Sequence, residues 1–209
     1  FEVATKKVPT TVEIQETTSV LNSLKYETEP VYSDKSLNRI LFGAPGTGKS
    51  HKVGKDMVDL LENAEKDYER VTFHPDYTYS QFVGTYKPVP IINKDGKEEI
   101  SYQYVPGPFI RSYVKALKSA QTDNPKPYLL LIEEINRAKV AAVFGDIFQL
   151  LDRKNGVSEY PIRTSEDLRH YLANELKVSE DKVATLTLPD NLYIWATMNS
   201  ADQGVFPMD

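Results

Sequence analysis

The chain has 209 residues, of which 40% are hydrophobic and 26% charged, and its formal net charge is -5. The length and composition are typical of a globular protein with one well-buried core. The net charge does not indicate a basic surface, so composition alone argues neither for nor against nucleic-acid binding. Cysteine is absent, which excludes disulfides and thiolate metal sites, and the longest aliphatic run, Leu129 to Ile132, is too short to span a bilayer. Because the N-terminus also lacks a secretory pattern, we expect a cytoplasmic protein without membrane contact.

The chain is predicted to divide near residue 35. Residues 1–35 are rich in Thr, Glu, Lys and Val without a sustained period, which predicts an N-terminal arm or linker. Over residues 36–209, strand-like and helix-like segments alternate, which favours one α/β domain with a mainly parallel sheet and helices on its faces.

A glycine-rich stretch, Gly43-Ala44-Pro45-Gly46-Thr47-Gly48-Lys49-Ser50, follows a short apolar strand predicted over 39–42 and precedes a helix predicted from His51 onward. This spacing of glycines before Gly-Lys-Ser, between a strand and a helix, predicts a phosphate-binding loop. Its glycines let main-chain N–H groups approach phosphate oxygens, while Lys49 supplies positive charge and the Ser50 hydroxyl can bind Mg²⁺. A glycine-rich turn with an incidental lysine is the alternative. We therefore expect residues 43–51 to bind a nucleoside triphosphate.

The next segments predict a strand, a hairpin and a helix. Arg70 to His74 predicts a second strand that ends at Pro75. Tyr86 to Ile92 and Glu99 to Val105 flank turn residues, which predicts a β-hairpin insertion around 86–105. That hairpin could be a solvent-exposed projection, or it could reach into a pore or an adjacent subunit. Apolar spacing then predicts a helix from Phe109 to Ala120.

Aromatic residues gather between the second strand and the hairpin. His74, Tyr77, Tyr79 and Phe82 could form a loop near the nucleotide or an aromatic cluster under the sheet. Because closely spaced aromatic side chains commonly pack against one another, we favour the cluster.

Polar residues follow two strands that are predicted to be buried. Pro127 to Ile132 is a continuous apolar run, as in a strand buried on both faces, and Glu133-Glu134 comes directly after it. At the C-terminal edge of a parallel sheet, one carboxylate would bind Mg²⁺ and the other would activate the attacking water, although ordinary surface glutamates are the alternative. Asn191 to Thr197 predicts another buried strand. Asn199 beyond it would bind the attacking water or the terminal phosphate, or would only form a turn.

Two further helices are predicted between these two strands. Val140 to Leu151 is strongly apolar, and Ser165 to Leu176 begins with a capping serine followed by two acidic residues. Between the acidic pair and the first of these helices, Arg137 could face the nucleotide of a neighbouring subunit or DNA, or could form a surface salt bridge.

Four stretches together resemble the AAA+ superfamily, and more narrowly the NTPase subunit of McrBC-type modification-dependent restriction systems. The chain resembles this family from about Asn38 to Asp209. The stretches are Leu41-Phe42 with the glycine-rich loop, Phe73-His74-Pro75-Asp76-Tyr77, Glu133-Glu134-Ile135-Asn136-Arg137-Ala138, and Met198-Asn199-Ser200-Ala201-Asp202. The last is close to the Met-Asn-Thr-Ala-Asp signature of that family.

The resemblance implies an AAA+ three-layer sandwich that hydrolyses GTP or ATP with Mg²⁺. It implies a homo-oligomer, usually a hexameric ring, that works with an McrC-like endonuclease subunit to translocate along and cleave modified DNA. Carried over residue by residue, Lys49 and Ser50 hold phosphate and metal, Glu133 contributes to the metal site, Glu134 is the catalytic glutamate, and Asn199 is the polar sensor.

Two departures from the family pattern favour a nucleotide-binding module that hydrolyses little. Glu133 stands where the superfamily usually has aspartate, so its metal contact is expected to be indirect. The paired arginines and helical lid of relatives are expected beyond Asp209. The DNA-reading domain is expected outside this chain, unless the N-terminal arm is its remnant. The alternatives are a nucleotide-binding assembly module with little hydrolysis, and a MoxR-like AAA+ ATPase that remodels proteins.

Overall fold

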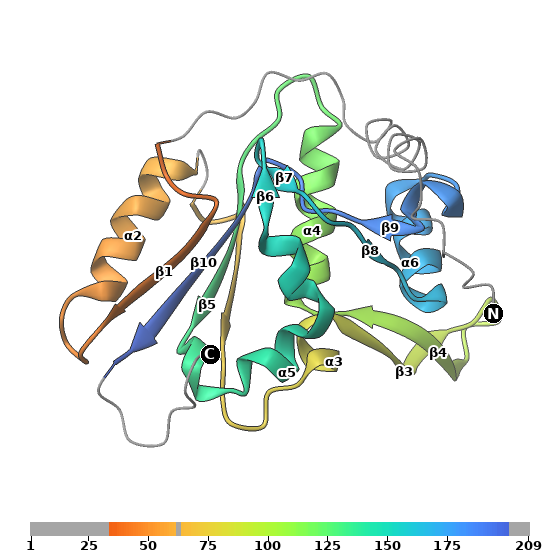
Figure 1. Ribbon diagram of the computed structural model, residues 1–209. Coiled ribbons are helices and arrows are strands. Elements are labelled where there is room, and N and C mark those ends of the chain that lie inside the picture. Colours follow the sequence, from red (N-terminus) through yellow and green to blue (C-terminus); the bar gives the residue numbers. More distant parts are fainter. Residues whose placement is uncertain (1–33, 62–63, 201–209) are drawn as a thin grey trace, which may run out of the picture.

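A computed structural model describes residues 34–61 and 64–200. Its centre is a four-stranded sheet in which every neighbouring pair of strands is parallel (Figure 1). The strands lie in the order β1 (Asn38–Gly43), β10 (Leu192–Asn199), β5 (Tyr128–Glu133) and β2 (Tyr68–Thr72). The predicted α/β class with a parallel sheet is confirmed.

The two middle strands are buried on both faces because alternate side chains enter two separate cores. On β5, Leu129 and Leu131 pack in a small core with α2 (Lys49–Leu60), whereas Leu130 and Ile132 pack in the larger core on the opposite face. On β10, Trp195 belongs to the small core. Figure 1 shows α2 on one side of the sheet and α4 on the other. This two-sided burial explains why both strands are continuous apolar runs.

The helices on the larger core begin where local sequence favours a helix start. Helix α4 (Pro108–Ala120) has proline in its first turn, where the missing N–H costs nothing. Helix α6 (Glu166–Leu176) is capped by Ser165, whose side chain accepts a hydrogen bond from the Leu168 amide. Both agree with the predicted helices to within one residue at each end.

The predicted hairpin is present as a separate two-stranded sheet. Strands β3 (Gly84–Ile92) and β4 (Glu98–Pro106) pair antiparallel, and Figure 1 shows them extending from the domain below α6. Tyr104 on β4 packs against Tyr171 of α6, with ring centroids 5.1 Å apart. Several large side chains along the hairpin are exposed, namely Tyr86, Ile92, Ile100 and Tyr102. Whether it reaches a pore or an adjacent subunit stays a prediction.

The predicted helix from Val140 to Leu151 is wrong as a single element. An α-helix, α5 (Val140–Phe144), gives way to a 3₁₀-helix, η2 (Gly145–Leu151). Gly145 has a φ of 54°, and a Cβ at this position would lie 3.2 Å from the Tyr79 ring. The close approach of that ring and the left-handed backbone explain why the α-helix stops there.

Other differences from the predicted elements are small. Strand β2 lies two residues earlier than the predicted second strand, although the Phe73 amide still donates to the Glu133 carbonyl at 2.9 Å. Several short elements were not predicted. They are α3 (Tyr79–Phe82), η1 (Ile135–Arg137), β6 (Arg153–Lys154), β7 (Val157–Ser158), β8 (Ile162–Arg163), η3 (Glu180–Val183) and β9 (Thr185–Leu186).

Some predictions fall outside the described residues. The predicted arm, apart from its last two residues, and the Ala201-Asp202 part of the signature stretch lie there. Within 34–61 and 64–200, none of the helices has the length and apolar character needed to cross a membrane.

The aromatic cluster is confirmed for its central members. Phe82 is fully buried, and its ring lies 5.6 Å from that of Phe73 and 4.9 Å from that of Phe144. Phe73 also stacks on Tyr77 at 4.7 Å. Tyr79 is different, because it is partly exposed and its hydroxyl donates to Asp146 at 3.3 Å.

The cluster yields a stability prediction. Truncating the fully buried Phe82→Ala leaves a cavity among packed rings, and we expect it to lower the free energy of unfolding by about 3–5 kcal/mol. Phe42→Ala is the matched control, because this side chain is 71% exposed. Its cost should stay below about 1 kcal/mol. Urea denaturation measures the free energy of unfolding of both variants. Similar losses of stability in the two would contradict a stabilising role for the aromatic cluster.

Candidate functional site

The glycine-rich loop and two strand ends form one cavity of about 480 Å³. Residues 45–51 line one side of it, and Glu133, Glu134, Thr197 and Asn199 line the other. The loop connects β1 to α2, whereas the polar residues come from the C-terminal ends of β5 and β10. Parallel pairing of these strands places the three segments together, as expected for ligand sites in open α/β sheets.

The loop has the backbone conformation that phosphate binding needs. Gly46 and Gly48 have φ values of 78° and 81°, and Gly48 is the N-cap of α2. Only glycine adopts this left-handed geometry at little cost. As a result, the main-chain N–H groups of the first turn of α2 lie at the cavity, where the helix dipole favours an anion.

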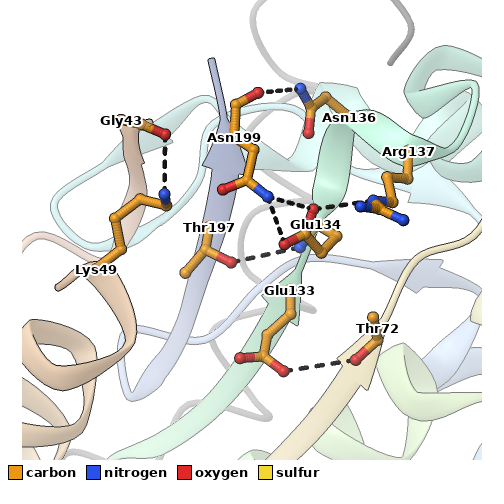
Figure 2. A network of polar contacts seen from close by, with 9 residues as sticks. All are labelled: Gly43, Lys49, Thr72, Glu133, Glu134, Asn136, Arg137, Thr197 and Asn199. Atoms are coloured by element: carbon orange, nitrogen blue, oxygen red, sulfur yellow. Dashed lines mark hydrogen bonds and ion pairs between the residues drawn. The ribbon is translucent and has the colours of Figure 1, made fainter. Parts of the chain in front are cut away.

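The Lys49 side chain contacts the main chain of the same loop. Its ammonium donates hydrogen bonds to the carbonyl oxygens of Gly43 and Ala44, at 2.8 Å each (Figure 2 shows the first). Charged phosphate oxygens are stronger acceptors than these carbonyls. Lys49 is therefore placed to exchange main-chain partners for a bound phosphate.

Glu134 and Asn199, predicted separately from two strand ends, are in direct contact (Figure 2). The Asn199 amide nitrogen donates to both Glu134 carboxylate oxygens, at 2.7 and 2.9 Å. Arg137 also donates to this carboxylate at 3.1 Å, so a salt bridge within the chain is present, as in one of the two expectations for Arg137. The Glu134 amide lies 3.4 Å from the Thr197 hydroxyl.

The backbone of Glu134 is itself unusual. Its φ of 55° and ψ of 43° are left-handed, although it is not glycine. Such a conformation costs a non-glycine residue about 1–2 kcal/mol, and residues strained in this way cluster at functional sites. It turns the chain sharply from β5 into η1.

Asn136 was not singled out from the sequence but supports the pair. Its side chain is buried, with 3% exposed, and its amide donates to the Asn199 carbonyl at 2.9 Å. The Ser200 amide donates to the Gly43 carbonyl at 3.2 Å on the other side of the same strand end. Asn199 is thus held between the turn after β5 and the start of the loop after β1.

Glu133 makes a different set of contacts. Its two carboxylate oxygens accept hydrogen bonds from Arg70 of β2, at 2.8 Å each, and the Thr72 hydroxyl lies 3.5 Å away. The hydrogen bond with Glu133 raises the pKa of Arg70 above its ordinary value. Arg70 was not predicted as a site residue.

The donor atoms fit Mg²⁺ only in combination with a nucleotide. Among the described residues there is no group of three or more His, Cys, Asp or Glu side chains able to hold a metal ion alone. The Ser50 hydroxyl and the Glu133 carboxylate nevertheless line the same cavity. Mg²⁺ commonly uses one or two such oxygen ligands together with substrate phosphates and water.

Comparison with known proteins identifies a matching family and two similar curated proteins. Residues 38–209 match the family described as AAA domain (dynein-related subfamily). The chain is 49% identical over 190 residues to the type II restriction enzyme BsuMI component YdiS of Bacillus subtilis, covering 82% of this chain and 53% of the relative. It is 30% identical over 176 residues to the type IV methyl-directed restriction enzyme EcoKMcrB subunit of Escherichia coli, covering 82% of this chain and 32% of the relative.

A solved structure is also similar. A presumed ATPase from Cytophaga hutchinsonii matches with a TM-score of 0.41 and 19% identity, over 94% of this chain and 42% of that one. The chain spans about half the length of the first curated relative and about a third of the second.

The left-handed turn at Glu134 yields a second prediction. Glu134→Gly and Glu134→Ala remove the same carboxylate, but only glycine relieves the backbone strain, so the glycine variant should be more stable by about 1 kcal/mol. At Glu133, within β5, the order should reverse by roughly 0.5–1 kcal/mol, since glycine weakens a strand. Chemical denaturation of the four variants measures both differences, and the same order at both positions would contradict the strained turn.

Proposed function

The chain belongs to the AAA domain family (dynein-related subfamily), and we propose that it is the nucleoside-triphosphatase domain of an McrB-like restriction subunit. The observation that carries this proposal is the contact between Asn199 and Glu134 in the cavity of the phosphate-binding loop. Its substrate is GTP or ATP, bound with Mg²⁺.

Substrate binding rests on the loop and the first turn of α2. Main-chain N–H groups of residues 43–51, apart from Pro45, surround the phosphates, and Lys49 neutralises the outer ones. Ser50 and Glu133, which line the same cavity, would hold Mg²⁺ there together with phosphate oxygens. When bound, the ion neutralises charge that develops on the transferring phosphoryl group.

Hydrolysis then depends on the residues that face the loop. Glu134 orients the attacking water and accepts its proton. The Asn199 amide, already within hydrogen-bonding distance of Glu134, positions that water or the terminal phosphate. Water attacks phosphorus, the bond to the leaving nucleoside diphosphate breaks, and inorganic phosphate is released.

The wider role follows from the relatives. Both curated relatives are named as parts of restriction enzymes, one of them methyl-directed, which favours a restriction subunit over a MoxR-like protein remodeller. We propose that the intact protein forms a homo-oligomeric ring, works with an McrC-like endonuclease subunit, and moves along modified DNA. Recognition of the modification would belong to another domain.

One feature favours a second candidate, a nucleotide-binding assembly module with little hydrolysis. Both carboxylates of the acidic pair are engaged by donors of the chain itself, Glu133 by Arg70 and Glu134 by Asn199 and Arg137. A carboxylate held in this way is less available to accept a proton from water. Bound nucleotide would then drive subunit assembly instead of turnover.

A comparison of three variants of the full-length protein tests the function. Glu134→Gln should keep nucleotide binding but lower GTP or ATP turnover about 100-fold or more, because the general base is lost. Lys49→Ala should weaken nucleotide binding at least about tenfold, because a charged phosphate partner is lost. Glu175→Gln is the control, since Glu175 lies on α6, pairs with Lys118 and does not line the cavity.

Phosphate release and fluorescent-nucleotide titration, with the nuclease partner and modified DNA present, provide the measurements. Equal turnover by the wild type and Glu134→Gln would contradict hydrolysis by this site. Nucleotide-dependent oligomerisation without turnover would select the assembly module. Undiminished binding by Lys49→Ala would overturn both candidates.

A further inference from the structure

Arg70, Thr72 and Glu133 lie on one face of the sheet because of strand register. Strands β2 and β5 pair in parallel with Thr72 opposite Glu133 and Arg70 opposite Leu131. Side chains two residues apart on a strand point to the same face, so Arg70 and Thr72 share a face with Glu133. Leu131 belongs to the core under α2, which places all three residues on the face that α2 covers.

The ion pair leaves neither Glu133 carboxylate oxygen without a cationic partner. Arg70 donates through Nε to one oxygen and through Nη2 to the other, at 2.8 Å each. This two-point geometry matches a guanidinium to a carboxylate and is stronger than a single contact. The Glu133 side chain is only 17% exposed, whereas that of Arg70 is 55% exposed, so the arginine neutralises a largely buried charge.

Mg²⁺ and Arg70 would use the same oxygens. A metal ion that bound Glu133 directly would need at least one oxygen now bonded to Arg70. Two positive groups close together also repel each other, and that repulsion is greater away from bulk water. The Arg70 ion pair therefore weakens the attraction of this carboxylate for a metal ion.

We propose that Arg70 is a positioning residue that holds Glu133 in an ion pair and thereby limits how tightly the nucleotide site takes Mg²⁺. This inference rests on the proposed function. Thr72, 3.5 Å from the same carboxylate, supports the held position. In the intact site Glu133 contributes mainly its charge, at a distance, and direct metal contact by this carboxylate requires release from Arg70.

The chain contains a matched control on the same strand. Glu69, next to Arg70 in β2, pairs with Arg111 of α4 through two nitrogen atoms, at 3.1 and 2.5 Å. Because neighbouring residues of a strand point to opposite faces, this pair lies away from the nucleotide cavity. Arg111→Gln removes a comparable ion pair without altering the contacts of Glu133.

The experiment measures Mn²⁺ binding, as a spectroscopic substitute for Mg²⁺, by electron paramagnetic resonance on the full-length protein. Each variant is titrated alone and with a non-hydrolysable GTP or ATP analogue. With analogue bound, Arg70→Gln should bind Mn²⁺ about tenfold more tightly, because one positive charge is removed and the carboxylate is released. The double variant Arg70→Gln with Glu133→Gln should lose that gain, and Arg111→Gln should match the wild type.

The outcomes separate this inference from the proposed function. Equal Mn²⁺ affinity in Arg70→Gln and the wild type would overturn the inference alone. A gain that persists in the double variant would also overturn it, since the effect would then come from charge removal without Glu133. A wild type that binds neither analogue nor Mn²⁺ would overturn the proposed function as well.

Arg70→Lys tests the same idea if Arg70→Gln is unstable. Lysine keeps the charge but cannot form the two-point contact. An Mn²⁺ affinity of Arg70→Lys between the affinities of the wild type and Arg70→Gln would support the inference. An affinity weaker than that of the wild type would overturn it.

Discussion

The parallel pairing of β10 between β1 and β5 is the constraint on which the site depends. In this register Gly43 lies opposite Asn199, and Ile132, next to Glu133, lies opposite Ala196. The polar ends of β5 and β10 and the loop that follows β1 therefore meet at the same edge of one sheet. The burial of β5 and β10 on both faces fixes this register, because a shift by one residue would exchange the side chains of the two cores.

The two glutamates of the acidic pair lie in different structural surroundings. Glu133 and Glu134 are adjacent in sequence but have different backbone conformations and different partners. Glu133 is the last residue of β5 and is held by an arginine, whereas Glu134 occupies a left-handed turn and is held by an amide and a second arginine. The turn separates the two carboxylates, so that like charges are directed to different parts of the cavity.

The contacts between Glu134, Asn199 and Asn136 connect two strand ends into one unit. Asn136 holds the main chain of Asn199, and Asn199 holds the carboxylate of Glu134. A small movement of β10 relative to β5 would change the direction of the Asn199 amide and therefore the position of the carboxylate.

Local sequence determined much of the fold and part of the site. The strand, glycine loop and helix around Lys49, the serine cap of α6 and the doubly buried strands β5 and β10 were predictable, because each depends on neighbours within a few positions. Only the tertiary structure decided the Arg70–Glu133 pair, the support from Asn136 and the end of α5 at Gly145. Arg70 and Glu133 are 63 residues apart, as are Asn136 and Asn199, and the Tyr79 ring comes from a distant segment to pack on Gly145. Strand register and packing bring these groups together, and neither is readable from the spacing of residue types along the chain.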